Sequence, residues 1–219
     1  MGAKTWMIAY VDSGTKLVDV FSASPQLDRE ASSKLAMELF PGMKLVPDAD
    51  GYLSYTCPPR KQVFAGCYPG VSVVAASQLG IDYPSKLPAT YLSAARGRDI
   101  YFLAMHSVVD WFAFAIWSSG KLTRSLSLSP DSKVLEDIGE HLPFEAPYWS
   151  GQRKVDSDDD EPYPLPFRPL ELGEVALFHF FGYSLEGGPG NDLPDEPRFD
   201  ADSIVLAGFR GSKPWWKIW

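Results

Sequence analysis

Residues 111–117 read Trp-Phe-Ala-Phe-Ala-Ile-Trp and are apolar on both of the faces that an extended chain presents. Successive side chains of a strand point to opposite sides of a sheet, so the two tryptophans point one way and Phe112, Phe114 and Ile116 the other. A strand that is apolar on both faces has to be covered on both. The pattern therefore predicts a central strand with packed layers above and below it.

Two further strand patterns flank this segment. Residues 100–106 form an apolar run before it, and the turn Ser-Ser-Gly-Lys at 118–121 leads into residues 122–129. In residues 122–129 the leucines share one face with Arg124 and the hydroxyl side chains share the other. We expect this strand either to be half exposed or to present its hydroxyl face to a groove.

The rest of the chain mixes strand and helix patterns. Further strand patterns lie at residues 5–12, 43–46, 52–56, 63–67, 71–75 and 203–209. Apolar stripes at helical spacing predict helices at residues 17–21, 28–40, 85–95 and 170–185, and one helical turn at 134–138. We therefore expect an α+β fold in which a mostly antiparallel sheet of about six to eight strands is covered by three or four helices.

Length and composition favour one domain. The 219 residues suit a single domain over residues 1–209, followed by a Trp-rich tail at 210–219. Within the domain, the proline-rich residues 142–169 include an acidic run and are expected to form a long surface excursion. Asp156, Asp158 and Asp160 have the alternating spacing of a calcium loop. The glycine and glutamate that such a loop needs later are missing, so we expect a solvated acidic loop.

Charge and hydropathy narrow the function classes. The net charge of −8 argues against a sequence-independent nucleic-acid binder, which needs a basic face. No run of apolar residues is long enough to span a membrane, and no secretory signal opens the chain. We therefore expect a cytoplasmic protein. A disulfide between Cys57 and Cys67 remains an alternative to two free thiols, which a reducing compartment favours.

Residues 106–110, His-Ser-Val-Val-Asp, hold the one His–Ser–Asp grouping in the sequence and join two of the expected central strands. A hydrolase could use His106 as a base with Ser107 or Asp110 beside it. On an extended chain, however, His106 and Ser107 point to opposite faces. The main alternative is that His106 and Asp110 brace the connection, and a binding role is a third.

No motif for a metal or a cofactor is present. Cys57 and Cys67 are ten positions apart, and neither Cys-x-x-Cys nor His-x-x-x-His spacing occurs. No glycine-rich phosphate or dinucleotide loop is recognisable. We expect neither a metal nor a cofactor.

Candidate binding residues lie on the expected hydroxyl face and in the aromatic segments beyond it. On the hydroxyl face they are Ser125 and Ser127, and in the proline-rich segment the candidate is Trp149. In the tail they are Trp215, Trp216 and Trp219. Exposed tryptophan side chains reduce solubility, so we expect the three rings of the tail to be covered by another surface. The tail could dock on its own domain, bind a partner protein or a second copy of the chain, or enter a membrane interface.

Several segments carry a resemblance to a known family. They are Met1-Gly-Ala-Lys-Thr5, Met105-His-Ser-Val-Val-Asp-Trp-Phe-Ala-Phe-Ala115, Arg124-Ser-Leu-Ser-Leu-Ser-Pro130, Pro143-Phe-Glu-Ala-Pro-Tyr-Trp149, Pro164-Leu-Pro-Phe167 and Gly182-Tyr-Ser-Leu-Glu-Gly187. Over residues 1–190 the chain resembles an uncharacterised family of actinobacterial proteins, a domain of unknown function. The resemblance implies a bacterial cytoplasmic protein and no activity, cofactor or site residue.

Two functional hypotheses follow. The first is a non-enzymatic protein- or ligand-binding domain. The second is a small hydrolase built on His106, Ser107 and Asp110. The hydrolase requires His106 to open onto a pocket within hydrogen-bond reach of Ser107 or Asp110.

Overall fold

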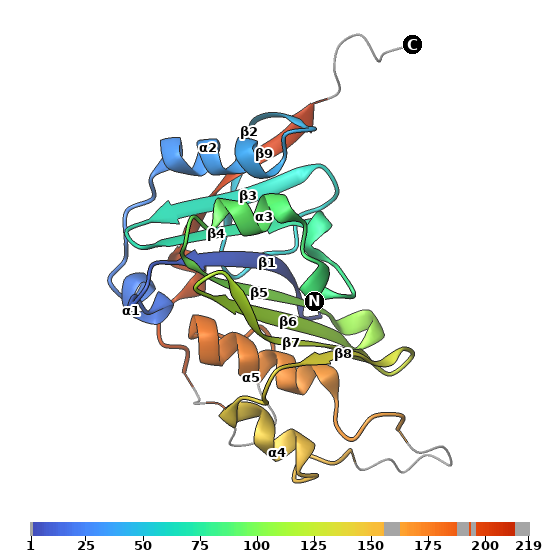
Figure 1. Ribbon diagram of the computed structural model, residues 1–219. Helices are drawn as coiled ribbons and strands as arrows, with labels where there is room; N and C mark the ends of the chain where they lie inside the picture. Colours follow the sequence, from blue (N-terminus) through green and yellow to red (C-terminus); the bar gives the residue numbers. More distant parts are fainter. Residues whose placement is uncertain (1, 156–162, 188–192, 194–195, 213–219) are drawn as a thin grey trace, which may run out of the picture.

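The computed structural model describes residues 2–155, 163–187, 193 and 196–212. Over these residues the strands join into one antiparallel sheet of nine strands in the order β2-β9-β3-β4-β1-β5-β6-β7-β8 (Figure 1). The strands are β1 (Lys4–Val11), β2 (Lys44–Tyr52), β3 (Gln62–Tyr68), β4 (Val71–Ala76), β5 (Asp99–His106), β6 (Trp111–Ser118), β7 (Lys121–Ser129), β8 (Lys133–Ile138) and β9 (Val205–Ser212).

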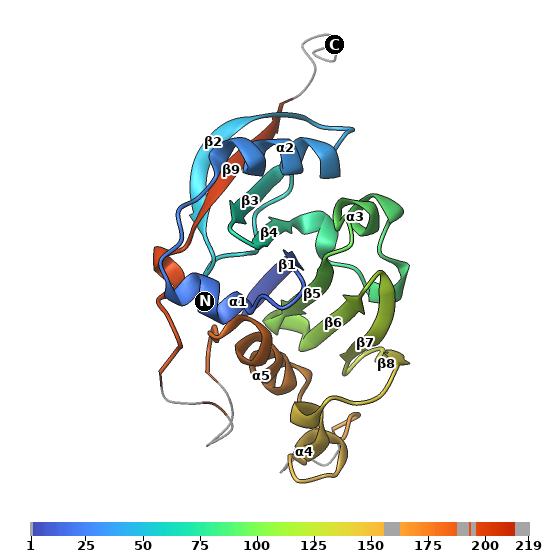
Figure 2. The same ribbon diagram turned by 60° about the vertical axis from the view of Figure 1, so that its left-hand side comes forward.

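Helices cover both faces of this sheet. The α-helices are α1 (Leu17–Ser22), α2 (Arg29–Leu39), α3 (Ala89–Ala94), α4 (Ala146–Trp149) and α5 (Pro169–Phe181). Helices α2 and α3 pack on one face, and α1 and α5 on the other (Figure 2). None of the helices in the described part of the chain is long and apolar enough to cross a membrane.

Strand β6 lies between β5 and β7 and confirms the pattern at residues 111–117. Every residue from Trp111 to Trp117 is buried. Trp111 and Trp117 belong to the core under α2 and α3, whereas Phe112 and Phe114 belong to the core under α5. The α+β class and the antiparallel sheet are thus as predicted.

The expected six to eight strands were too few. Residues 43–46 and 52–56 were expected to form two strands around a turn. Instead β2 runs through the polar segment at 48–51, with a shift in its pairing to β9 between Asp48 and Gly51. Because β2 is an edge strand, most of its side chains face solvent and its sequence carries no burial pattern.

Residues 134–138 form the edge strand β8 and not the expected helical turn. Val134 pairs with Leu128 and Ile138 with Ser125 of β7. A single helical turn has little stability of its own, whereas the edge of β7 offers hydrogen-bonding partners to any extended segment beside it.

The last helix ends earlier than predicted. It was expected to run to residue 185, but α5 stops at Phe181 because Gly182 adopts a left-handed conformation with φ of 82° and terminates it. In the proline-rich excursion, the described residues contain the short helix η4 (Pro143–Glu145) followed by α4.

Candidate functional site

The connection between β5 and β6 places the three residues of the His–Ser–Asp grouping in different surroundings. It is a single turn of 3-10 helix, η3 (Ser107–Val109), ended by Asp110 in a left-handed conformation with φ of 45°. No hydrogen bond joins His106 to Ser107 or Asp110 among the described residues. The structure therefore does not assemble the base and nucleophile that the hydrolase hypothesis requires.

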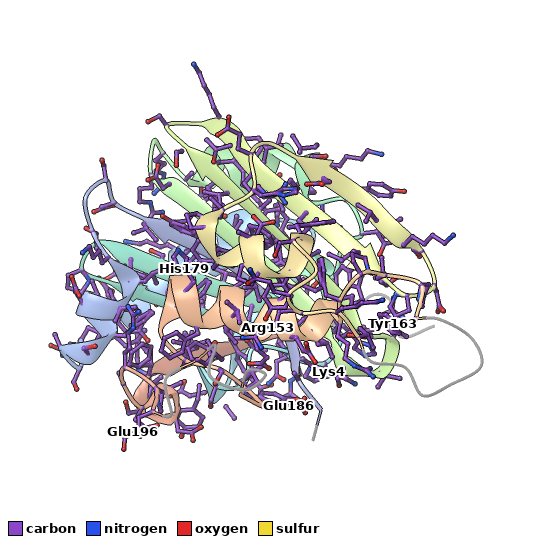
Figure 3. All side chains as sticks on the ribbon, turned by 90° about the horizontal axis from the view of Figure 1, so that it is seen from below. Lys4, Arg153, Tyr163, His179, Glu186 and Glu196 are labelled. Carbon is purple, nitrogen blue, oxygen red and sulfur yellow. The ribbon has the colours of Figure 1, made fainter. Side chains whose placement is uncertain are left out.

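Asp110 braces the connection against α5. One carboxylate oxygen accepts a hydrogen bond from the backbone N–H of Leu170 at 3.1 Å, and the other accepts one from the hydroxyl of Tyr163. Leu170 lies in the first turn of α5, where backbone N–H groups lack partners within the helix, and the preceding Arg168 provides no side-chain cap. In Figure 3, His179 lies near the end of α5, and Tyr163 lies in the segment that precedes the helix.

Ser107 packs against the start of the chain. Its backbone N–H donates to the carbonyl of Ala3 at 2.9 Å. A Cβ at Gly2 would lie 2.0 Å from the Ser107 hydroxyl oxygen, so the two residues are in tight contact. Ser107, which the hydrolase hypothesis assigns as the nucleophile, is therefore packed against Gly2 and Ala3.

His106 belongs to a group of three aromatic rings from adjacent strands. Its imidazole stacks on the indole of Trp6 with ring centroids 5.5 Å apart and planes 16° apart. The indole of Trp111, which pairs with His106 across β5 and β6, lies 6.1 Å from that of Trp6. Burial, with a smaller effect from Lys4, lowers the pKa of His106 below its usual 6.5. The imidazole is therefore mostly neutral at pH 7.

These rings line a pocket with a volume of about 510 Å³ that opens to solvent. Segments from five strands and the loops between them contribute to it. The remaining lining residues are Ser77, Gly80, Asp82, Val109, Ser129, Asp131, Ser132 and Leu135. The pocket therefore combines an aromatic wall with hydroxyl and carboxylate groups, as small-molecule sites commonly do.

The buried serines of β7 make hydrogen bonds to Trp111 of the aromatic wall and to Glu136. The indole N–H of Trp111 donates to the hydroxyl of Ser127 at 3.2 Å, which fixes the plane of the ring. Ser125 and Ser85 both donate hydroxyl hydrogen bonds to the buried carboxylate of Glu136. Ser125 and Ser127 are thus enclosed, and neither lines a groove as was expected of the hydroxyl face; among its serines, Ser129 reaches the pocket.

Trp149, the candidate from the proline-rich segment, does not line this pocket. It is half-buried in α4, where it stacks on His141 at a centroid distance of 4.8 Å and meets Phe167 edge-on at 5.0 Å. Its indole N–H points at the carboxylate of Glu145. Trp215, Trp216 and Trp219 lie outside the described residues, so the proposed role of the tail stays a prediction.

A larger hollow of about 910 Å³ lies between α2 and the turn that joins β3 to β4. Its arginines are engaged by the chain itself: Arg96 pairs with Glu38 at 2.7 Å, and Arg98 donates to Ser72 at 3.0 Å. It has no aromatic wall comparable to that at His106. We therefore take the smaller pocket as the candidate site.

The described residues offer little to a metal ion. No three of their His, Cys, Asp and Glu side chains converge on one point. Cys57 and Cys67 are free thiols, and burial raises the pKa of Cys57.

Sequence reasoning identified His106 and the hydroxyl face that contains Ser129, but missed the rest of the pocket. Trp6 was predicted only as part of the strand at residues 5–12, and Asp82 and Asp131 were not singled out. Only the strand order β1-β5-β6-β7-β8 brings these segments to one place. One available signal was that Trp6 and Trp111 both lie in predicted strands, at positions that could share a face of the sheet.

Comparison with known proteins gives a family. A model described as "Family of unknown function (DUF6928)" matches residues 5–209. Neither a curated protein nor a solved structure matches the sequence. Because the family model covers nearly the whole chain, the protein belongs to this family of unknown function.

Proposed function

We propose that the protein is a non-enzymatic ligand-binding protein whose site is the pocket formed by Trp6, His106 and Trp111. The observation that carries this proposal is the aromatic wall, in which a stacked His106–Trp6 pair and a tethered Trp111 face an open cavity. Such rings provide a large apolar contact area at a low cost in side-chain entropy.

The rim of the pocket supports the same proposal. Val108 is 74% exposed and Val109 is 47% exposed, although both lie in a structured turn beside the opening. Apolar side chains left in solvent next to a cavity are typical of a surface that is covered when a ligand binds. A ligand would bury Val109 together with the aromatic wall.

A substitution at Gly80 tests directly whether this pocket is the binding site. The φ of Gly80, −78°, is accessible to any residue, and a Cβ there would stand 3.4 Å from the indole of Trp6. Gly80→Leu should therefore fill the pocket without straining the backbone. The matched control is Gly42→Leu, because Gly42 has open space around its Cβ position and an ordinary φ.

The experiment screens a panel of small amines, alcohols and carboxylic acids by tryptophan fluorescence and by ligand-observed NMR. We expect at least one chemical class to bind the wild type and Gly42→Leu, and to lose binding at least tenfold in Gly80→Leu. If no class binds, or if binding survives in Gly80→Leu, the proposed site is wrong.

A further inference from the structure

We propose that the pocket selects a small organic cation, with its ammonium group against the Trp6 and Trp111 indoles and between Asp82 and Asp131. This inference rests on the proposed binding function and names the class of ligand. Of the eleven residues that line the pocket, two are carboxylates and none is lysine or arginine. The fixed charge around the cavity is therefore negative.

The two carboxylates are available to a ligand. Neither Asp82 nor Asp131 makes a hydrogen bond or an ion pair with another described residue, and both are exposed at the opening. They come from separate segments, one from the loop after η1 (Ser77–Leu79) and the other from the turn between β7 and β8. Both carboxylates would attract a cation in the pocket through their negative charge.

The aromatic wall favours the same kind of ligand. The face of an aromatic ring is electron-rich and attracts cations, most strongly for tryptophan. A positively charged imidazole would oppose such a ligand, but burial lowers the pKa of His106 below 6.5, which favours the neutral imidazole at pH 7. Lys4 acts on His106 from the neighbouring strand β1 and is not among the residues that line the pocket.

Neutral ligands are the competing class. A sugar also stacks on tryptophan, and its hydroxyls would bond to the Ser129 and Ser132 hydroxyls and to the carboxylates. A cation is favoured because a neutral ligand would leave the negative charges of Asp82 and Asp131 without a counter-charge. The two classes differ in how strongly binding depends on charge and on salt.

The test compares choline with its uncharged isostere 3,3-dimethylbutan-1-ol, using the full chain, tryptophan fluorescence and calorimetry. We expect choline to bind at least tenfold more tightly, with an affinity that falls as salt is added. Asp82→Asn and Asp131→Asn should each reduce choline binding severalfold and leave the alcohol unchanged. Asp19→Asn, at an exposed carboxylate of α1, is the matched control and should change neither.

The outcomes separate the two proposals. Equal binding of both compounds, unaffected by the Asp82 and Asp131 variants, overturns the cation preference and leaves the pocket as a binding site. Tighter binding of a monosaccharide such as glucose than of choline overturns it as well. If neither choline nor the alcohol binds at tens of millimolar and the wider panel also fails, the binding function itself is overturned.

Discussion

The guanidinium of Arg124 and the carboxylate of Glu145 form a bidentate ion pair that is closed off from solvent, with nitrogen–oxygen distances of 2.9 and 2.5 Å. The side chains are 1% and 0% exposed. Arg124 also contacts Asp137 at 2.6 Å, and Glu145 accepts from the backbone of Leu142 at 2.8 Å. The pair therefore ties the proline-rich excursion to the β7–β8 edge of the sheet.

Glu145→Ala should leave the Arg124 charge buried with Asp137 as its remaining carboxylate partner. We expect the free energy of unfolding to fall by about 3–5 kcal/mol, as for other buried pairs that lose one partner. Urea denaturation measures this. Glu30→Ala is the control, because Glu30 is in an exposed pair with Lys34 and its removal should change little. Equal effects of the two substitutions would show that the buried pair does not hold the excursion.

Asp110→Ala should weaken the start of α5. The substitution removes the acceptor for the Leu170 N–H and for the Tyr163 hydroxyl, and we expect a loss of about 1–2 kcal/mol. Asp110→Asn should lose less, because asparagine tolerates the left-handed backbone and keeps one acceptor. A double-mutant cycle with Tyr163→Phe should show coupling between Asp110 and Tyr163. Additive effects would mean that their hydrogen bond contributes nothing.

The parts of the fold that could be predicted are those where the burial of a strand can be read from its own sequence. The doubly apolar β6 needed no knowledge of its neighbours, because its own period of two requires cover on both faces. Edge strands carry no such signal. Val134 and Ile138 of β8 are each 42% exposed, so their pairing with β7 could not be inferred from burial.

A bulge explains one further difference in β7. Leu122 was predicted to share a face with Arg124. The pairing of β6 with β7 shifts by one residue between Ile116 and Trp117, so Leu122 opposite Trp117 turns to the other face. Arg124 stays on the original face, where its guanidinium pairs with Glu145 of η4 and lies over Phe114. Bulges depend on both strands at once, so one strand's pattern cannot reveal them.

The site was less predictable than the fold because it also depends on which strands are neighbours in the sheet. His106 stood out because it ends a strand beside a polar connection. Its partner Trp6 is 100 positions away in the sequence, and only the pairing of β1 with β5 brings the two rings together. Adjacency of strands is not encoded in local periodicity.

Removing the Lys4 charge should raise the pKa of His106. Lys4 pairs with His106 across β1 and β5, and its positive charge disfavours the imidazolium. In Lys4→Gln the pKa should move upward but stay below 6.5, since burial is the larger cause. An NMR titration of the imidazole ring protons measures the shift, with Lys16→Gln, at the residue before α1, as the control. An unchanged pKa in Lys4→Gln would exclude this electrostatic contact.

Glu174 should make stability depend on pH near neutrality. The carboxylate is 3% exposed on α5 and accepts hydrogen bonds from the backbone N–H groups of Leu185 at 2.7 Å and Glu186 at 3.2 Å. Burial outweighs these bonds and raises its pKa from 4.5 to about 7. The folded state therefore binds the proton more tightly than the unfolded state does. Its contribution to stability is complete below pH 4.5 and is lost as pH rises through 7.

Glu174→Gln should remove this dependence, because glutamine keeps a carbonyl acceptor and carries no charge. Between about pH 5 and pH 8 we expect the free energy of unfolding of the wild type to fall relative to that of the variant, by at most about 3 kcal/mol. Urea denaturation at both pH values measures the difference, with the exposed Glu140→Gln as control. If wild type and Glu174→Gln change in parallel with pH, the loop at 185–186 is not held by a titrating carboxyl. A divergence confined to Glu174→Gln would assign the titration to this one buried side chain.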